Sequence, residues 1–314
     1  MRNSGDKVVA EPIVFFGSGP VAAASLELLA NSFNIETVVT KPRPLHHRGA
    51  VPVVIAAEKL ALPIITTADK SELSTKIAEA NFKSRVAVLI DFGIIVKQDV
   101  IDTFPFGIIN SHFSLLPEWR GADPITFAIL SGQHRTGISL MLLVEPLDEG
   151  PLLAQVPYDM APAETTPSLT EALIELSYKS LCEILPLYLS GSAVPAPQEA
   201  VTIASSPEPI YSRKLTKEDG VLDFNKPAAI IEREIRAYLE WPKSHATIAG
   251  KDIVVTAAHV VATDSVNKVG TVFTLNKELL IQTGDGVLVV DSLKPAGKPE
   301  MRAAAFVAGY GRNL

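Results

Sequence analysis

The sequence is poor in cysteine and tryptophan, with one Cys and two Trp in 314 residues. The single cysteine, Cys182, excludes an intramolecular disulfide and a zinc site built from cysteines. It falls in an apolar, helix-like segment, so we expect a buried thiol with a structural role. No uninterrupted apolar run reaches the roughly 18 residues that a membrane-spanning helix requires. Residues 1–7 contain no apolar signal-peptide region, and we expect a cytoplasmic protein.

The chain also lacks an excess of positive charge, because 28 Lys and Arg residues face 35 Asp and Glu residues. The resulting net charge of -7 disfavours a nucleic-acid partner, since phosphate contacts supply most of the binding energy of such complexes. The deficit is confined to residues 1–205, with 14 basic and 22 acidic residues, whereas residues 206–314 hold 14 and 13. The second part therefore permits a local RNA contact, although solvated surface charge explains the same composition.

Apolar residues, in contrast, make up 47% of the chain. This content excludes disorder as the main state, and the length suits two domains. Small residues and proline dominate residues 191–209, which is typical of a linker that runs over the surface. We therefore expect a first domain at residues 1–190 and a second at residues 210–314, with no internal repeat.

Short apolar runs alternate with helix-like stretches in the first domain. We expect strands at 12–16, 35–39, 63–65, 85–90, 107–112, 137–144 and 152–158, and helices at 21–31, 51–61, 73–80 and 167–188. Alternating strands and helices predict an α/β fold: a Rossmann-like, doubly wound, mostly parallel sheet with helices on both faces. The last of these helices should close the domain.

The second domain differs in composition from the first and is rich in runs of β-branched residues. We expect a helix at about 226–237 followed by strands at 246–248, 252–260, 270–274, 278–282 and 286–293, with glycines between several of them. Several short strands separated by turns predict a smaller β-barrel of the oligonucleotide-binding (OB-like) type.

Polar side chains converge at the end of one predicted strand of the first domain. Asn110 and His112 stand two residues apart there, so both side chains point to the same side of the sheet. Ligands of open α/β sheets collect outside the carboxyl ends of the strands, where this pair would lie. A rigid loop follows, and Asp123 and Pro124 at its end read as the N-cap and first residue of a helix.

A second loop, residues 145–150, follows the neighbouring strand and carries Asp148. A carboxylate at this place can orient His112 and fix its tautomer, an arrangement used in acyl-transfer chemistry. Each of these residues alone is more typical of a turn or a packing position. The joint pattern of Asn110, His112, the rigid loop and the acidic turn favours a catalytic site.

The first turn offers a rival interpretation. Residues 17–22 fit the pattern G-x-G-x-x-A after a strand, which favours a nicotinamide dehydrogenase. Pro20 removes a donor from the loop that would hold the pyrophosphate, and Thr40 and Lys41 replace the acidic ribose ligand. Arg43 would have to serve a 2′-phosphate, so this interpretation predicts binding of NADPH.

Two segments of the sequence resemble the methionyl-tRNA formyltransferases. The strings NSHFSLLPEWRGADP (110–124) and TGISLMLLVEPLDEGPLLA (136–154) are similar to that family's signature segments. The resemblance extends over nearly the whole chain and implies a formyltransferase fold with a tRNA-binding second domain. It also implies that Asn110, His112 and Asp148 are catalytic, that 10-formyltetrahydrofolate is the co-substrate, and that no metal is used.

The resemblance further implies which residues bind the substrates. Folate contacts are expected from Ile90, Phe92, Gly93, Ser114, Leu115, Leu116, Pro117 and Gly150, and tRNA contacts from Lys41, Arg43, Arg48 and Arg120. The initiator methionyl-tRNA is the expected acceptor, and we expect a monomer because the sequence shows no oligomerisation element.

The sequence departs from the family pattern at a few positions. Glu118 replaces a frequently basic residue, and residues 91–93 (Asp-Phe-Gly) replace an Ala-Tyr-Gly-like segment. The runner-up acceptor is an amino-sugar nucleotide, because some enzymes that formylate amino sugars carry a related second domain. A non-catalytic RNA-binding protein is a third hypothesis, supported only by the barrel-like domain.

Overall fold

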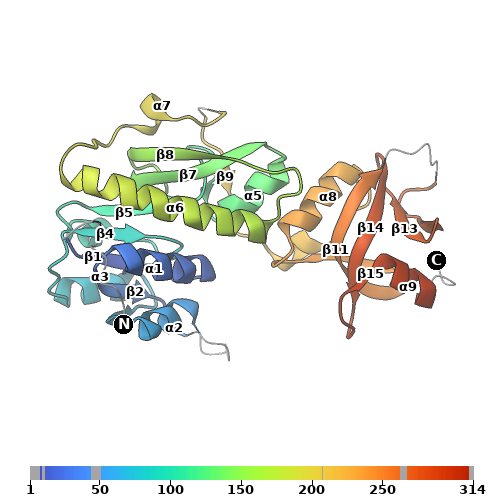
Figure 1. Cartoon of the computed structure of the whole chain (residues 1–314), viewed down its shortest axis with the longest axis horizontal. Helices are drawn as coiled ribbons and strands as arrows, with labels where there is room; N and C mark the ends of the chain where they lie inside the picture. The colour runs from blue at the N-terminus through green and yellow to red at the C-terminus, as the bar shows by residue number, and fades with distance from the viewer. Residues whose placement is uncertain (1–7, 9–10, 44–50, 207, 262–266, 311–314) are drawn as a thin grey trace. The chain divides into compact units, whose positions relative to one another are not determined.

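A computed structural model describes residues 8, 11–43, 51–206, 208–261 and 267–310 of the chain (Figure 1). The chain forms two compact units that interleave along the sequence. The first comprises Met1–Gly121, Arg135–Asp159 and Thr170–Tyr211, and the second comprises Ala122–His134, Met160–Leu169 and Ser212–Leu314. The expected domains were continuous in sequence, whereas here two short segments before residue 170 pack with the second unit.

A seven-stranded sheet with the order β3-β2-β1-β4-β5-β7-β8 forms the centre of the first unit. Its strands are β1 (Ile13–Phe16), β2 (Ile35–Thr40), β3 (Ile64–Thr66), β4 (Val86–Leu89), β5 (Ile108–His112), β7 (Arg135–Leu142) and β8 (Leu152–Asp159). The first five pair in parallel, and β7 and β8 pair antiparallel. The prediction of a mostly parallel sheet is confirmed.

Helices cover both faces of this sheet, as the alternating pattern predicted (Figure 1). They are α1 (Pro20–Ser32), α2 (Pro52–Lys59), α3 (Lys70–Glu79), α4 (Gln98–Ile101) and α6 (Thr166–Leu189). The first unit also contains the short helix α7 (Gln198–Val201). Residues of α3 and α4 share one buried core with Val14 and Phe16 of β1. On the opposite face, Ser111 of β5 exchanges a 2.7 Å hydroxyl hydrogen bond with Ser177 of α6. The alternation of β5 therefore turns Asn110 and His112 away from α6.

Residues of the segment after β4 pack against the glycine turn that follows β1. The hydroxyl of Ser18 donates to the carbonyl of Phe92 at 2.6 Å, which holds the turn against the segment after β4. A Cβ on Gly19 would lie 2.0 Å from a carboxylate oxygen of Asp91. A carboxylate at this distance repels a phosphate, so the structure argues against the dinucleotide-binding interpretation of this turn.

The second unit contains a six-stranded antiparallel sheet with the order β10-β11-β14-β13-β12, in which β15 also pairs with β14. The strands are β10 (Ser244–Ile248), β11 (Lys251–Val261), β12 (Val272–Leu275), β13 (Glu278–Gln282), β14 (Val287–Pro295) and β15 (Met301–Arg302). The helical segments are α5 (Pro124–Ser131), η1 (Lys217–Gly220), α8 (Ala228–Ala237) and α9 (Ala303–Tyr310). Ile231 and Phe306 anchor α8 and α9 in the core under this sheet. The pairing of β11 with β14 contains register shifts at Val255–Ala258, which are typical of a β-bulge. Among the described residues the strand path runs from β10 to β12 without a pairing between these two ends, so the structure shows an antiparallel sheet domain, and closure into the predicted OB-like barrel stays a prediction.

Two local expectations need correction. Asp123 is the N-cap residue of α5 and Pro124 is its first residue, as expected, but the φ of Asp123, 57°, is left-handed and its side chain makes no capping bond. The carboxylate instead accepts the backbone N–H of Leu215 at 3.3 Å. Cys182 lies in α6 as expected, but it is half-buried instead of buried.

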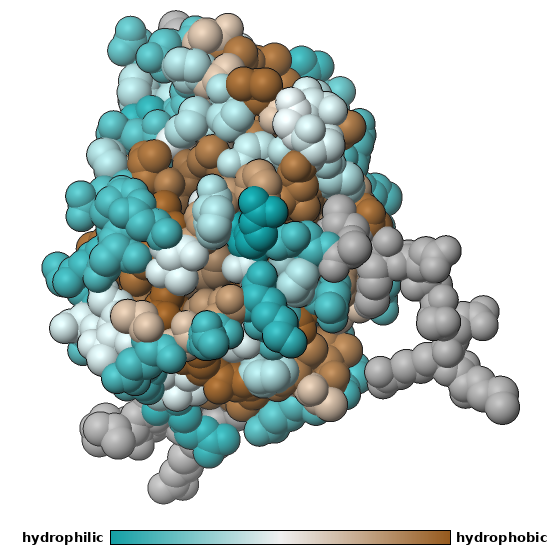
Figure 2. Space-filling model, turned by 90° about the vertical axis from the view of Figure 1, so that its left-hand side faces the viewer, coloured by the Kyte–Doolittle hydropathy of each residue, from teal (hydrophilic) through white to brown (hydrophobic). Residues whose placement is uncertain are grey.

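Apolar and polar residues are interspersed on the face of the protein that Figure 2 shows. Among the described residues, no helix combines the length and apolar character needed to cross a bilayer. The same part of the chain contains no cluster of three or more His, Cys, Asp or Glu side chains suited to a metal ion.

Candidate active site

Strand β5 delivers two of the predicted catalytic side chains. It lies between β4, its parallel neighbour, and β7, its antiparallel neighbour, so its backbone hydrogen bonds are made on both edges. Asn110 is opposite Leu89 on one side and Met141 on the other. Asn110 and His112 are only 6% and 7% exposed, so each polar group needs a partner inside the protein.

The third side chain comes from the turn that links β7 to β8. Asp148 has a left-handed φ of 53°, which is strained for a non-glycine residue. Two residues later, a Cβ on Gly150 would lie 1.7 Å from the backbone carbonyl oxygen of Leu142. The turn therefore needs glycine at position 150, and this close approach helps to hold Asp148 over the end of β5.

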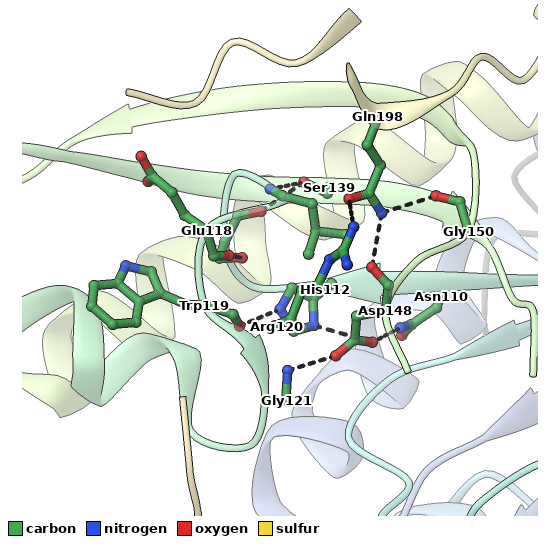
Figure 3. A network of polar contacts seen from close by, with 12 residues as sticks. Asn110, His112, Glu118, Trp119, Arg120, Gly121, Ser139, Asp148, Gly150 and Gln198 are labelled. Atoms are coloured by element: carbon green, nitrogen blue, oxygen red, sulfur yellow. Dashed lines mark hydrogen bonds and ion pairs between the residues drawn. The ribbon is translucent and has the colours of Figure 1, made fainter. Parts of the chain in front are cut away.

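The carboxylate of Asp148 meets Asn110, His112 and the loop after β5 (Figure 3). Its Oδ2 atom accepts the backbone N–H of Gly121 at 2.7 Å. Its Oδ1 atom accepts from Nδ2 of Asn110 at 3.4 Å and lies 3.8 Å from Nδ1 of His112. The structure thus brings together the amide, the imidazole and the carboxylate that the sequence singled out.

The imidazole of His112 is oriented from its other side by a backbone carbonyl. Its Nε2 atom donates to the carbonyl oxygen of Trp119 at 2.9 Å. Because a carbonyl oxygen can only accept, the hydrogen of the neutral ring is placed on Nε2. Nδ1 then carries the free lone pair of the neutral ring, and it faces Asp148.

Sequence reasoning missed a fourth buried side chain at this site, that of Gln198 in α7. It is 3% exposed, although it belongs to a segment expected to run over the surface. Its Nε2 atom donates to the backbone carbonyls of Asp148 at 2.8 Å and Gly150 at 3.0 Å. Its Oε1 atom accepts from the guanidinium of Arg120 at 2.8 Å. No local sequence pattern predicts a role for Gln198, because its partners, two backbone carbonyls and a guanidinium, lie far away along the chain.

The predicted folate residues fall into two groups. The side chains of Ile90, Phe92, Leu115 and Leu116 are buried. Phe92, for example, packs edge-on against Phe16 with ring centres 5.4 Å apart. These residues can therefore meet a ligand only through their backbones.

The remaining predicted folate positions are also structural, with one exception. The hydroxyl of Ser114 donates to the carbonyl of Glu118, and Pro117 is buried in the same loop. Gly150 shapes the Asp148 turn, whereas Gly93 is exposed, has a φ of 65° and lies beside the ammonium group of Lys41.

The residues predicted to contact tRNA differ in their exposure to solvent. Lys41 and Arg43 follow β2, with Lys41 half-buried and Arg43 exposed, and Arg48 lies outside the described residues. Arg120 is 9% exposed, and it pairs with Glu149 at 3.2 Å in addition to Gln198. The position of Arg120 does not support the expected contact with tRNA, because its guanidinium is engaged within the protein.

Two large apolar side chains, Ile95 and Leu147, are exposed by 65% and 63%. Ile95 belongs to the segment after β4, and Leu147 directly precedes Asp148. Ile95 and Leu147 were not predicted as site residues from the sequence, since an isoleucine or leucine in a loop carries no signal by itself.

A separate cavity of about 400 Å³ is lined by Phe104, Phe106, Leu143 and other residues, but by none of the catalytic candidates.

The fold and the polar site define a formyl transferase. The sequence model of the formyl transferase family matches residues 13–185, and that of the formyl transferase C-terminal domain matches residues 214–311. A methionyl-tRNA formyltransferase of Roseiflexus castenholzii is 35% identical over 95% of both chains, and that of Myxococcus xanthus is 36% identical over 95% of both. The chain belongs to the methionyl-tRNA formyltransferase family.

A solved structure shows the same fold at low sequence identity. An N-formyltransferase of Helicobacter canadensis, in complex with folinic acid and dTDP-3-aminofucose, has a TM-score of 0.64 and 15% identity, with 90% of this chain and 98% of that chain covered. The likeness supports the two-unit architecture over nearly the full length of both chains.

The close approach at Gly150 yields a stability prediction. Gly150→Ala should lower the free energy of unfolding by roughly 1–3 kcal/mol, because the new methyl group meets a backbone carbonyl that cannot move alone. Urea unfolding followed by circular dichroism measures the change. Gly309→Ala is the matched control, since a methyl group added there would have no atom within 4 Å beyond its own helix and chain neighbours. Equal unfolding midpoints for the two variants would show that the turn does not depend on glycine.

Proposed function

We propose that this protein transfers the formyl group of 10-formyltetrahydrofolate to the amino group of initiator methionyl-tRNA. The observation that carries the proposal is the convergence of Asn110, His112 and Asp148 at the end of β5. Family membership supplies the reaction class, and the names of the relatives favour the tRNA acceptor. That acceptor places the reaction in the cytoplasm, and one chain carries all three groups, which is consistent with a monomer.

The reaction needs a hydrogen-bond donor where negative charge develops. The acceptor amine attacks the formyl carbon, and the former carbonyl oxygen becomes an oxyanion in the tetrahedral intermediate. One amide hydrogen of Asn110 is directed at Asp148, so we assign the second to the oxyanion. The strand on which Asn110 lies is paired on both edges, which fixes the donor before the reaction begins.

The reaction also moves a proton from the attacking amine to N10 of the departing folate. His112 and Asp148 are the groups that we assign to this transfer, because Nδ1 of the imidazole and Oδ1 of the carboxylate face each other at 3.8 Å. The bond from Nε2 to the Trp119 carbonyl keeps the ring in place while Nδ1 changes its protonation state.

The folate is proposed to bind between the segment after β4 and the turn that carries Asp148. Ile95 and Leu147 supply exposed apolar surface on these two segments, which suits the flat pterin ring. Backbone groups of Ile90, Phe92 and Gly93 offer polar partners for the pterin. The buried residues 114–117 pack within the protein and help to hold the site in shape. This assignment retains the predicted folate segments but changes the role of most of their side chains.

An amino-sugar nucleotide is the second candidate acceptor. The fold likeness to the Helicobacter canadensis enzyme, whose structure contains dTDP-3-aminofucose, motivates it. Incubation with 10-formyltetrahydrofolate and either methionyl-tRNA or a panel of amino-sugar nucleotides separates the two functions. Formylated methionyl-tRNA supports the proposal, whereas formylation of the sugars alone would replace it.

The oxyanion role of Asn110 makes a kinetic prediction. Asn110→Ala should stay folded and lower kcat by roughly a hundredfold to a thousandfold, as expected for the loss of one oxyanion donor. Single-turnover formylation of methionyl-tRNA measures the loss, and a melting curve checks the fold. Turnover equal to that of the unmodified protein would remove Asn110 from the mechanism.

Lys41, Arg43 and Arg48 are proposed to contact phosphates of the tRNA. Arg43 is exposed, so Arg43→Ala should raise KM for methionyl-tRNA several-fold and leave kcat nearly unchanged. Lys70→Ala, at an exposed cation on α3, is the control for the loss of one positive charge. Equal KM values for the two variants would leave Arg43 without a binding role.

A further inference from the structure

The side chain of Gln198 satisfies three polar groups that belong to two different loops of the site (Figure 3). Its two amide hydrogens go to the carbonyls of Asp148 and Gly150, and its amide oxygen accepts from Arg120. Two donors and one acceptor at the end of a side chain of this length are properties of glutamine alone. Glutamate lacks the donors, and methionine lacks all three groups.

The chain around Gln198 is attached to the same loop at further points. The hydroxyl of Thr202 donates to the carbonyl of Leu116 at 2.6 Å. The carboxylate of Glu118 accepts the backbone N–H groups of Ser205 and Ser206 at 2.8 Å and 3.1 Å. Glu118 is 4% exposed, so the carboxylate that accepts these two bonds is shielded from water. Residues 198–206 are therefore bound along the loop that follows β5.

The turn that carries Asp148 depends on such support. Its left-handed backbone is strained, and a conformation of this kind persists only where surrounding contacts hold it. Gln198 bonds to the carbonyl of Asp148 itself and to that of Gly150, on either side of Glu149. The direction of the Asp148 carboxylate toward His112 and Gly121 is therefore coupled to the position of α7.

We propose that Gln198 is a positioning residue for formyl transfer, which fixes the Asp148 turn through two hydrogen bonds and links it to Arg120 through a third. The inference rests on the proposed function, because it assigns Gln198 an effect on the chemistry through Asp148. Gln198 does not touch the reacting atoms. Its removal displaces the carboxylate from His112, and a displacement of about 1 Å in a catalytic group can cost roughly a hundredfold in rate.

The first experiment measures steady-state formylation by Gln198→Met in the full chain. We expect kcat to fall by about tenfold to a hundredfold, while KM for folate and for methionyl-tRNA stays within about threefold. Glu199→Met is the matched control, because Glu199 is the exposed neighbour of Gln198 in α7. An unchanged kcat, or a change in KM alone, would overturn the proposal.

A double-mutant cycle with Asp148→Asn separates positioning from a general structural role. If Gln198 acts through Asp148, Gln198→Met should lower the single-turnover rate by less than about threefold in the Asp148→Asn background. The same tenfold or larger fall in both backgrounds would show that Gln198 acts independently of Asp148.

Gln198→Glu keeps the acceptor for Arg120 and removes both donors to the turn. It should show the same fall in kcat, and it decides the question by the same criteria if Gln198→Met fails to fold. A wild-type kcat for this variant would overturn the proposal. Absence of formyl transfer by the unmodified protein would instead refute the proposed function, so the two failures are distinguishable.

Discussion

The carboxylate of Asp148 joins three parts of the first unit that lie far apart in the sequence. It is 6% exposed, accepts the Gly121 N–H at 2.7 Å and lies within 4 Å of Asn110 Nδ2 and His112 Nδ1. A buried carboxylate is tolerated only where hydrogen bonds or charges replace its water. The turn, the loop and the end of β5 are therefore held in mutual register by the carboxylate that faces Nδ1 of the imidazole.

The sheet explains why this convergence occurs at β5. The parallel strands bring their carboxyl ends to one edge, and the antiparallel return of β7 leads the chain back beside β5 before the Asp148 turn begins. Alternation on β5 sends Ser111 to the helix on one face and its two neighbours to the other. A change of one residue in the register of β5 would therefore remove both Asn110 and His112 from the site.

Features that depend on local pattern could be predicted from the sequence. Alternating apolar runs and helix-like stretches gave the order of strands and helices in the first unit, and the i, i+2 spacing placed Asn110 and His112 on one face. The division of the chain was less predictable. The contacts that bring α5 and residues 160–169 into the second unit are made to segments far along the chain.

The role of residues 198–206 illustrates the limit of composition. Proline and small residues are typical of a surface linker, and Val194 and Val201 are indeed exposed. Gln198 is nevertheless buried, because carbonyl groups of a distant turn and a guanidinium of a distant loop supply its partners. Likewise, the inward packing of Phe92 follows from the core beneath β1 and β4, which no local pattern at residues 90–93 reveals.

A backbone carbonyl fixes the ring of His112 so that Nδ1 faces Asp148. The ¹⁵N NMR shifts of the imidazole, assigned by comparison with a His112→Gln variant, test it directly. We expect the neutral ring to carry its hydrogen on Nε2 and Nδ1 to have the shift of an unprotonated nitrogen. A neutral ring with its hydrogen on Nδ1 would contradict the bond to Trp119 and the geometry built on it.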